Sequence, residues 1–155
     1  MQIRQASSDD IIQLIDIRLA YLAEDHGGLS DVEIQEIKNQ LPAYYNNHLQ
    51  KDLFIYICEE EDEIISSVFL ISLEKPASPM FLNGKNGMIL NVYTRPEYRK
   101  RGIAGALMKE AIEGARERGL PFIELKATKA GESLYKTCGF VPDDSKYLSM
   151  RYNIR

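Results

Sequence analysis

Three basic residues stand immediately before a predicted amphipathic helix, in the stretch RKRGIAG at positions 99–105. From Ile103 onward, apolar side chains recur at the three- and four-residue spacing of one helical face. A helix N-terminus already carries roughly +0.5 elementary charge, so added cations are unfavourable there unless an anion binds. Free amides, glycines that admit a phosphate, and the cations Arg99, Lys100 and Arg101 together predict an anion-binding turn. A solvated basic turn is the alternative.

The length and charge of the chain limit the classes of protein that it can be. Its 155 residues suit one domain, expected to span 1–155, with a sizeable core. The net charge of −4 argues against nucleic-acid binding, which needs a basic face to displace counterions. We find no apolar run typical of a signal peptide or a membrane span, so we expect a cytoplasmic protein without a membrane partner. Cys58 and Cys138 have no other Cys or His at ligand spacing, so neither a metal site nor a disulfide framework is expected.

Strands and helices alternate along the chain in a way that predicts one mixed α/β domain. Strands are expected at 3–6, at 52–74 as a hairpin around the acidic turn 59–63, at 88–93 and at 121–125. Helices are expected after the capping patterns Ser7 with Asp10 and Ser30 with Glu33, from Ile103 to about Gly119, and within 131–139. Pro42 is expected to kink or end the second helix.

The C-terminal segment KYLSMRYNI, residues 146–154, has the pattern of a half-buried strand. Its two alternating sets of side chains are Leu148, Met150, Tyr152 and Ile154 on one face and Tyr147, Ser149, Arg151 and Asn153 on the other. Alternation of this kind predicts a last strand with one face on the core.

Two short motifs occur in the order and context of one enzyme family. Arg99–Ala104 (RKRGIA) fits (R/Q)-x-x-G-x-(G/A) between a strand and a helix, and Leu134–Phe140 (LYKTCGF) fits L-Y-x-x-x-G-F after a later strand. Together they resemble the GNAT superfamily of acetyl-CoA-dependent N-acetyltransferases. Rival phosphate-binding loops do not fit, because the chain has neither G-x-x-x-x-G-K-(S/T) nor G-x-G-x-x-G.

The resemblance implies the GNAT fold, an α/β (mixed α+β) domain whose central mixed, mostly antiparallel sheet is flanked by helices. It implies acetyl-CoA as cosubstrate, no metal, and a primary amine of a small molecule, protein or peptide as acceptor. That amine would attack the thioester directly in a ternary complex. Dimers are frequent in the family, which makes a homodimer possible. The alternative from another class is a non-catalytic acyl-CoA-binding regulatory or scaffold module.

The same resemblance assigns roles to individual residues. The pyrophosphate of CoA would lie against the amides of the basic turn, and an amide of Val92 or its neighbour would hold the thioester carbonyl. Tyr135 would protonate the departing thiolate, since a phenol with a reference pKa of ~10 is protonated at neutral pH. Thr128 and Gly131 stand where the family commonly has Asn and Ala. The expected cofactor-binding residues are Val92, Tyr93, Thr94, Arg99, Lys100, Arg101, Gly102, Ile103, Ala104, Gly105 and Thr128.

The general base is open at this stage. The strand 88–93 carries no Asp or Glu, a common place for the base in this family. Asn91 could instead orient a water molecule that takes the proton, and we include it with Tyr135 as an expected catalytic residue. Glu124 and the turn Glu24–His26 are the other candidates.

Overall fold

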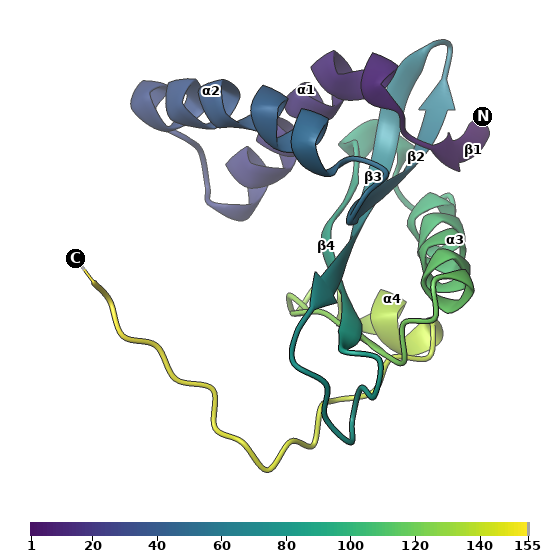
Figure 1. The fold of residues 1–155 in the computed structure, drawn as a ribbon. Helices are drawn as coiled ribbons and strands as arrows, with labels where there is room; N and C mark the ends of the chain where they lie inside the picture. Colours follow the sequence, from purple (N-terminus) through teal and green to yellow (C-terminus); the bar gives the residue numbers. More distant parts are fainter. Residues whose placement is uncertain (155) are drawn as a thin grey trace.

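The computed structural model describes residues 1–154 (Figure 1). Five strands form one sheet in the order β1-β2-β3-β4-β5, and all neighbours are antiparallel except β4 and β5. The strands are β1 Gln2–Gln5, β2 Leu53–Glu60, β3 Glu63–Glu74, β4 Lys85–Thr94 and β5 Ile123–Glu124. The helices are α1 Ile11–Asp25, α2 Asp31–His48, α3 Ile103–Glu117 and α4 Glu132–Thr137, with short 3-10 helices η1 Ser8–Asp10 and η2 Pro96–Tyr98. The expected mixed, mostly antiparallel sheet flanked by helices is confirmed.

Helices cover both faces of the sheet, with α1 and α2 on one face and α3 on the other (Figure 1). Leu107 of α3 is fully buried in a cluster that includes Val68 of β3. On the opposite face Leu14 of α1 and Tyr45 of α2 pack in a second cluster with Phe69. The adjacent residues Val68 and Phe69 therefore point into different layers, as the two-residue period of a strand requires.

Side-chain caps start the N-terminal helices where the sequence predicts them. Ser7 with Asp10 and Ser30 with Glu33 both form complete capping boxes. The expectation that Pro42 kinks or ends the second helix is wrong in so far as α2 continues to His48. A proline inside a helix removes one backbone hydrogen bond. The residues on either side of it, such as the fully buried Tyr45, hold the last turns of α2 against the sheet.

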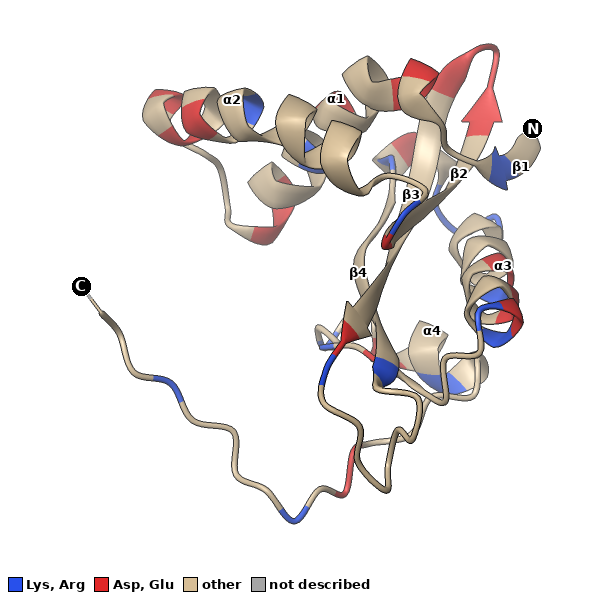
Figure 2. Ribbon diagram, viewed as in Figure 1, with Lys and Arg blue, Asp and Glu red and all other residues tan. Residues whose placement is uncertain are grey.

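The hairpin that joins β2 to β3 turns at Glu61 and Asp62, both of which have positive φ angles. Two such residues in a two-residue connection match the twist of antiparallel strands. Figure 2 shows this end of the hairpin in red. Glu61, Asp62 and Glu63 are exposed, as predicted for the acidic turn, whereas Glu59 and Glu60 are half-buried.

An extra residue interrupts the regular pairing of β4 with β3. Phe69 lies opposite Leu90, but Ser67 lies opposite Tyr93, so β4 has one residue more than β3 between these pairs. Asn91 lies at this β-bulge with φ 54°, a left-handed conformation that asparagine adopts more readily than most residues.

The two parallel strands separate soon after they meet. β5 pairs with β4 only at Gly87 and Met88. Beyond Met88 that edge of β4 has no strand beside it within residues 1–154, and the opening that results lies next to the β-bulge.

The expected last strand at 146–154 is wrong for this chain taken alone. Residues 141–154 form no strand and extend away from the body (Figure 1). Leu148, Met150, Tyr152 and Ile154 are between 83% and 90% exposed. Alternation predicts a strand only where a neighbouring strand and a core surface are available, and neither lies beside this segment.

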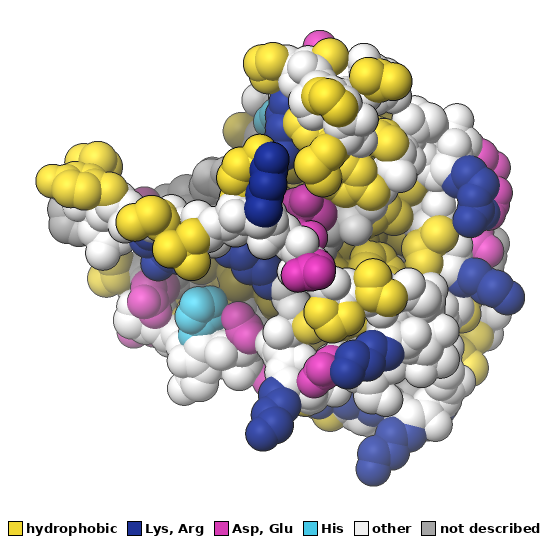
Figure 3. Space-filling model, turned by 90° about the horizontal axis from the view of Figure 1, so that it is seen from below, with side chains coloured by type: hydrophobic (Ala, Val, Ile, Leu, Met, Phe, Trp, Pro, Cys, Tyr) yellow, Lys and Arg dark blue, Asp and Glu magenta, His cyan; other side chains and the backbone are white. Residues whose placement is uncertain are grey.

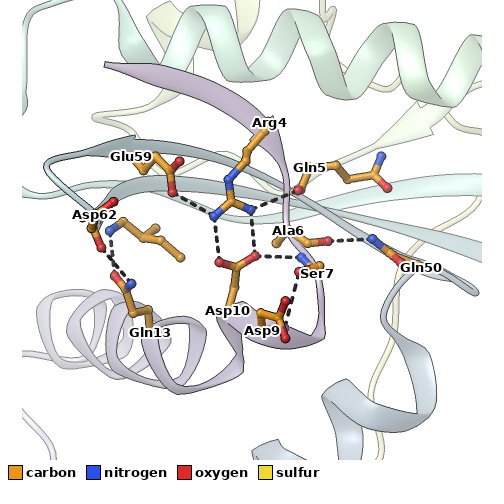
Figure 4. Close-up of polar contacts among 11 residues, drawn as sticks. Arg4, Gln5, Ala6, Ser7, Asp9, Asp10, Gln13, Gln50, Glu59 and Asp62 are labelled. Carbon is orange, nitrogen blue, oxygen red and sulfur yellow. Dashed lines mark hydrogen bonds and ion pairs between the residues drawn. The ribbon is translucent and has the colours of Figure 1, made fainter.

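The guanidinium of Arg4 joins β1, η1 and β2 (Figure 4). Its two terminal nitrogens donate to the two carboxylate oxygens of Asp10 at 2.8 Å each, and one also donates to Glu59 at 2.8 Å. Asp10 accepts a further bond from the backbone N–H of Ser7 at 2.8 Å. Because Asp10 is buried, this carboxylate needs its partners to remain charged inside the protein.

We predict that Asp10→Asn lowers the free energy of unfolding by about 1–3 kcal/mol at neutral pH, because the bidentate ion pair with Arg4 is lost. Hydrogen bonding to Arg4 holds the pKa of Asp10 below its usual value. Its contribution is therefore present above the usual carboxyl pKa and disappears as pH falls through the lowered value. Denaturant unfolding at several pH values should show this acid-dependent loss in the wild type and in the exposed control Asp9→Asn, but less of it in Asp10→Asn. Equal stability of both variants at neutral pH would contradict the prediction.

Candidate active site

The basic turn leads into α3 through two residues in left-handed backbone conformation. Lys100 has φ 62° and the N-cap Gly102 has φ 75°. Gly102 provides no side chain to cap the amides of the first helical turn, whereas Ser30 caps α2 with its hydroxyl. A Cβ added at Gly102 would meet nothing within 4 Å, so the space in front of the helix is open. Uncapped amides facing open space are suited to an anion.

Arg99 is held by protein groups on the α1 side of the turn. Its Nε donates to the backbone oxygen of Thr94 at 2.8 Å, and its Nη2 lies 2.6 Å from a carboxylate oxygen of Glu24. Its guanidinium also lies 5.5 Å from the ring centroid of Tyr93. Arg99 therefore links α1 to the end of β4. Its role beside a phosphate stays a prediction, because its positive charge is already paired with the carboxylate of Glu24.

All three cations of the turn, which is blue in Figure 2, are exposed, but Lys100 and Arg101 have no carboxylate partner within residues 1–154. Arg101 donates to the backbone oxygen of Glu97 at 3.2 Å and lies over the ring of Tyr98 at 5.2 Å. Neither contact neutralises its charge. The positive charge at the start of α3 is therefore available to an anion.

The predicted cofactor-binding residues of β4 lie at the opening between β4 and β5. Val92 is half-buried and packs on the α3 side of the sheet. Tyr93 and Thr94 are buried, and the hydroxyl of Ser66 donates to the backbone oxygen of Tyr93 at 2.8 Å and lies 2.8 Å from the Thr94 hydroxyl. These contacts fasten the end of β4 to β3 next to the basic turn.

Asn91 is buried and its side chain has protein partners at both polar atoms. Its Oδ1 accepts a hydrogen bond from Arg18 at 3.0 Å, and its Nδ2 donates to the hydroxyl of Ser67 at 3.0 Å. Arg18 comes from α1, so this side chain links the helix to the β-bulge. Through these contacts Asn91 positions Arg18 and the β-bulge. Its role in orienting a water molecule stays a prediction.

Tyr135 on α4 is half-buried, and its ring packs edge-on to Phe140 with centroids 6.2 Å apart. Burial, with smaller effects from the Tyr21 hydroxyl and the Cys138 thiol, raises its pKa above the ordinary tyrosine value. A phenol with a raised pKa keeps its proton at neutral pH and can donate it.

Gly131 and Thr128 hold the start of α4. A Cβ at Gly131 would lie 2.9 Å from a ring carbon of Tyr135, so alanine at this position would displace the ring. The hydroxyl oxygen of Thr128 accepts the N–H of Gly131 at 3.1 Å. Its hydroxyl proton remains available, so the predicted contact of Thr128 with the cofactor is chemically open.

A cavity of about 140 Å³ lies on the α1–α2 side of the sheet, beside the β-bulge. Arg18 is its only charged lining residue. The others are Gln40, Leu41, Tyr44, Tyr45, Phe69 and Leu90. Sequence reasoning missed Arg18. Its position could have been inferred from the sequence, because Arg18 follows the buried Leu14 by four residues and so lies on the same face of α1.

The other candidate bases lie apart from this cavity's lining. Glu24 is paired with Arg99, which lowers the pKa of its carboxyl. Asp25 lies 3.6 Å from His26, and Glu124 is exposed on β5.

An opening between parallel strands beside an uncapped helix start is suited to an extended, anionic cosubstrate. The profile of the Acetyltransferase (GNAT) family matches residues 17–140, and the chain belongs to this family. It is an acetyl-CoA-dependent acyltransferase.

Individual proteins support the same assignment. The chain is 32% identical to a predicted acetyltransferase from Clostridium acetobutylicum, solved with acetyl-CoA, over 97% of this chain and 95% of that one, with a TM-score of 0.84. A GCN5-related N-acetyltransferase from Ralstonia eutropha is 27% identical over 96% and 97% of the two chains, with a TM-score of 0.73. An N-acetyltransferase of Archaeoglobus fulgidus is 27% identical over 126 residues, 81% of this chain and 80% of that protein.

Within residues 1–154 no helix is both long enough and apolar enough to cross a membrane. The same residues contain no group of three or more His, Cys, Asp or Glu side chains placed to bind a metal ion.

We predict that Gly102→Glu weakens CoA binding at least about tenfold, or ~1.4 kcal/mol, because a carboxylate would occupy the position of the anion. Gly119→Glu is the matched control, since Gly119 follows the same helix with φ 68° and equally open surroundings. Both variants carry the same backbone strain and the same charge. Calorimetric titration with CoA should show near-normal affinity for Gly119→Glu. Normal affinity in a folded Gly102→Glu variant would rule out an anion site at this turn.

Proposed function

We propose that this chain transfers the acetyl group of acetyl-CoA to a primary amine by direct attack in a ternary complex. The observation that carries this proposal is the position of the β-bulge at Asn91. It lies between the opening at the β4 edge and the cavity lined by Arg18, so two substrates could approach the same short stretch of strand from opposite sides.

The residues of the basic turn and of β4 fit acetyl-CoA by their chemistry. The uncapped amides from Gly102 to Gly105 and the charges of Lys100 and Arg101 would hold the pyrophosphate. The backbone of Val92–Thr94 would accompany the pantetheine arm, and the hydroxyl proton of Thr128 is free to bond it. Acetyl-CoA supplies an activated acyl group, and the chain supplies orientation and charge stabilisation.

The proposed chemistry needs two contributions from the protein. An amide at Val92 or its neighbour would donate to the thioester oxygen as negative charge develops there, a type of contact worth roughly 2.7–4 kcal/mol in other acyl-transfer sites. The amine nitrogen forms a bond to the carbonyl carbon, and the carbon–sulfur bond breaks. Tyr135 gives its proton to the leaving thiolate and regains one that originates from the attacking nitrogen.

We further propose that the acceptor reacts as a neutral amine that has lost its proton to solvent before attack. The cavity beside the β-bulge has the cation of Arg18 and no carboxylate in its lining. A positive neighbour disfavours the ammonium form and so lowers the pKa of a bound amine. In this proposal Asn91 positions Arg18 and the β-bulge and does not act as a base.

Tyr135→Phe should reduce turnover by roughly 10²–10⁴-fold, because the ring and its packing remain while the proton donor is lost. Acetyl-CoA affinity should change little, since the proposed anchoring groups lie on the turn and on β4. The loss should lessen as pH rises towards a thiol pKa of ~8.5, where the thiolate leaves unaided. Steady-state thiol release with one accepted amine measures the effect, and Tyr147→Phe, at an exposed tyrosine, is the control.

Equal turnover by wild type and folded Tyr135→Phe would remove this residue from the chemistry. Thiol release without any amine would indicate hydrolysis. Acetyl-CoA binding with no turnover across a panel of amines would favour the alternative of a binding module.

The pH dependence of kcat/KM tests the neutral-amine proposal. Without a protein base, kcat/KM should rise about tenfold per pH unit below the pKa of the acceptor amine. For two acceptors whose amines differ in pKa, the pH profile of kcat/KM should lie at higher pH for the acceptor with the higher pKa. A shared plateau near neutral pH for both amines would instead reveal a base in the protein.

A further inference from the structure

Arg18 on α1 is a half-buried cation whose charge no carboxylate balances within residues 1–154. Arg99, by contrast, lies 2.6 Å from a carboxylate oxygen of Glu24. The side-chain hydrogen bond of Arg18 goes from Nη1 to the neutral amide oxygen of Asn91, so its Nε and Nη2 have no acceptor in the described chain. Withdrawing a guanidinium from water without a counter-charge is unfavourable. Arg18 is therefore suited to an anion that comes from outside the chain.

The cavity that Arg18 lines combines this single charge with apolar and aromatic walls. Tyr45 and Phe69 are buried walls, and Leu90 lies next to the β-bulge. The volume of about 140 Å³ is small beside the ~300–1,000 Å³ of pockets that hold drug-sized ligands. None of the residues 141–154, which project from the body in Figure 3, lines the cavity. The cavity therefore fits a small molecule with an apolar body and one anionic group.

We propose that the acceptor is a small primary amine that carries a carboxylate, and that Arg18 binds this carboxylate through Nε and Nη2. The inference rests on the proposed function, in which this cavity receives the acceptor. Two parallel N–H groups of a guanidinium match the two oxygens of a carboxylate. A phosphate group carries about −1.5 to −2 charges at pH 7, which is more than the one cation of this lining balances.

The contact would hold the acceptor at a defined place beside β4. Arg18 bonds Asn91 at 3.0 Å, and Asn91 in turn bonds the hydroxyl of Ser67 at 3.0 Å, so the guanidinium is fixed relative to the β-bulge. In solution the carboxylate of such an acceptor favours the ammonium form of its own amine. Pairing that carboxylate with Arg18 offsets this effect, so the pKa of the bound amine falls, as attack by a neutral amine requires.

The test compares matched acceptors with and without a carboxylate on the full chain. The pairs are leucine with 3-methylbutylamine and 4-aminobutyrate with propylamine. For each pair, steady-state thiol release at saturating acetyl-CoA gives the ratio of kcat/KM with the carboxylate to kcat/KM without it. Arg18→Gln should lower this ratio by roughly 10- to 100-fold in at least one pair. The amines within a pair also differ in pKa, but that difference is the same for every variant and cancels.

Arg118→Gln is the matched control. Arg118 is also half-buried without a carboxylate partner in residues 1–154, but it lies 3.6 Å from the ring centroid of Phe54 and outside the cavity lining. The ratio should stay unchanged in this variant, since a general loss of stability lowers both rates together. Arg18→Lys keeps the charge without the two parallel donors, so it should lower the ratio less, and it replaces Arg18→Gln if that variant does not fold. An unchanged ratio in both pairs in an active Arg18 variant would overturn the inference.

Binding of a carboxylate without an amine separates this inference from the proposed function. Calorimetric titration of the CoA-saturated protein with 4-methylpentanoate and with 4-methylpentanamide decides the case if no amine is acetylated. Binding of the acid but not of the amide, weakened at least about tenfold in Arg18→Gln, would support the carboxylate site even though the proposed acetyl transfer had failed. Equal binding of acid and amide, or no binding of the acid, would overturn the site. Acetylation that favours the amines without a carboxylate in both pairs would also overturn it, while acetyl transfer itself would stand.

Discussion

The β-bulge at Asn91 is the feature on which the rest of the site depends. A regular strand would place Ile89 and Asn91 on one face and Leu90 and Val92 on the other. In this protein Ile89 and Val92 pack in the α3 cluster, whereas Leu90 and Tyr93 pack in the α1–α2 cluster. The alternation therefore shifts by one residue within β4. Asn91 provides the left-handed backbone, and its amide is bonded to the sheet at Ser67 and to α1 through Arg18.

Basic residues around the end of β4 divide into those that hold the fold and those that face solvent. Arg95 bonds the backbone of Ile64 at 3.1 Å and the carboxylate of Asp16 at 2.8 Å, and so fastens β3 and α1. Arg99 makes the corresponding bridge to Glu24. The cations between Arg95 and Arg101 therefore have two different roles. Arg95 and Arg99 are paired with carboxylates, whereas Lys100 and Arg101 have no carboxylate partner in the described chain.

Local sequence signals predicted the parts of this fold that are held by local interactions. The capping boxes at Ser7 and Ser30 and the apolar face of α3 depend on residues three or four apart, so they could be predicted without the tertiary structure. The continuation of α2 past Pro42 depends on packing against the sheet, and sequence alone does not reveal it. Arg18 was missed for the same reason, because its partner Asn91 lies 73 residues away. The last strand failed differently: its alternation is real, but within residues 1–154 no strand lies beside it.

The shifted alternation of β4 also sets where the chain can gain or lose a residue. Loss of one residue between Leu90 and Tyr93 would remove the β-bulge: Leu90 and Tyr93 would stay on the α1–α2 face, but the strand would no longer have the extra residue at which Asn91 bonds Arg18 and Ser67. By contrast, the loop at 75–84 crosses the surface between two strands and can change length without altering which side chains face the core. Related chains should therefore vary in length at that loop far more readily than within β4.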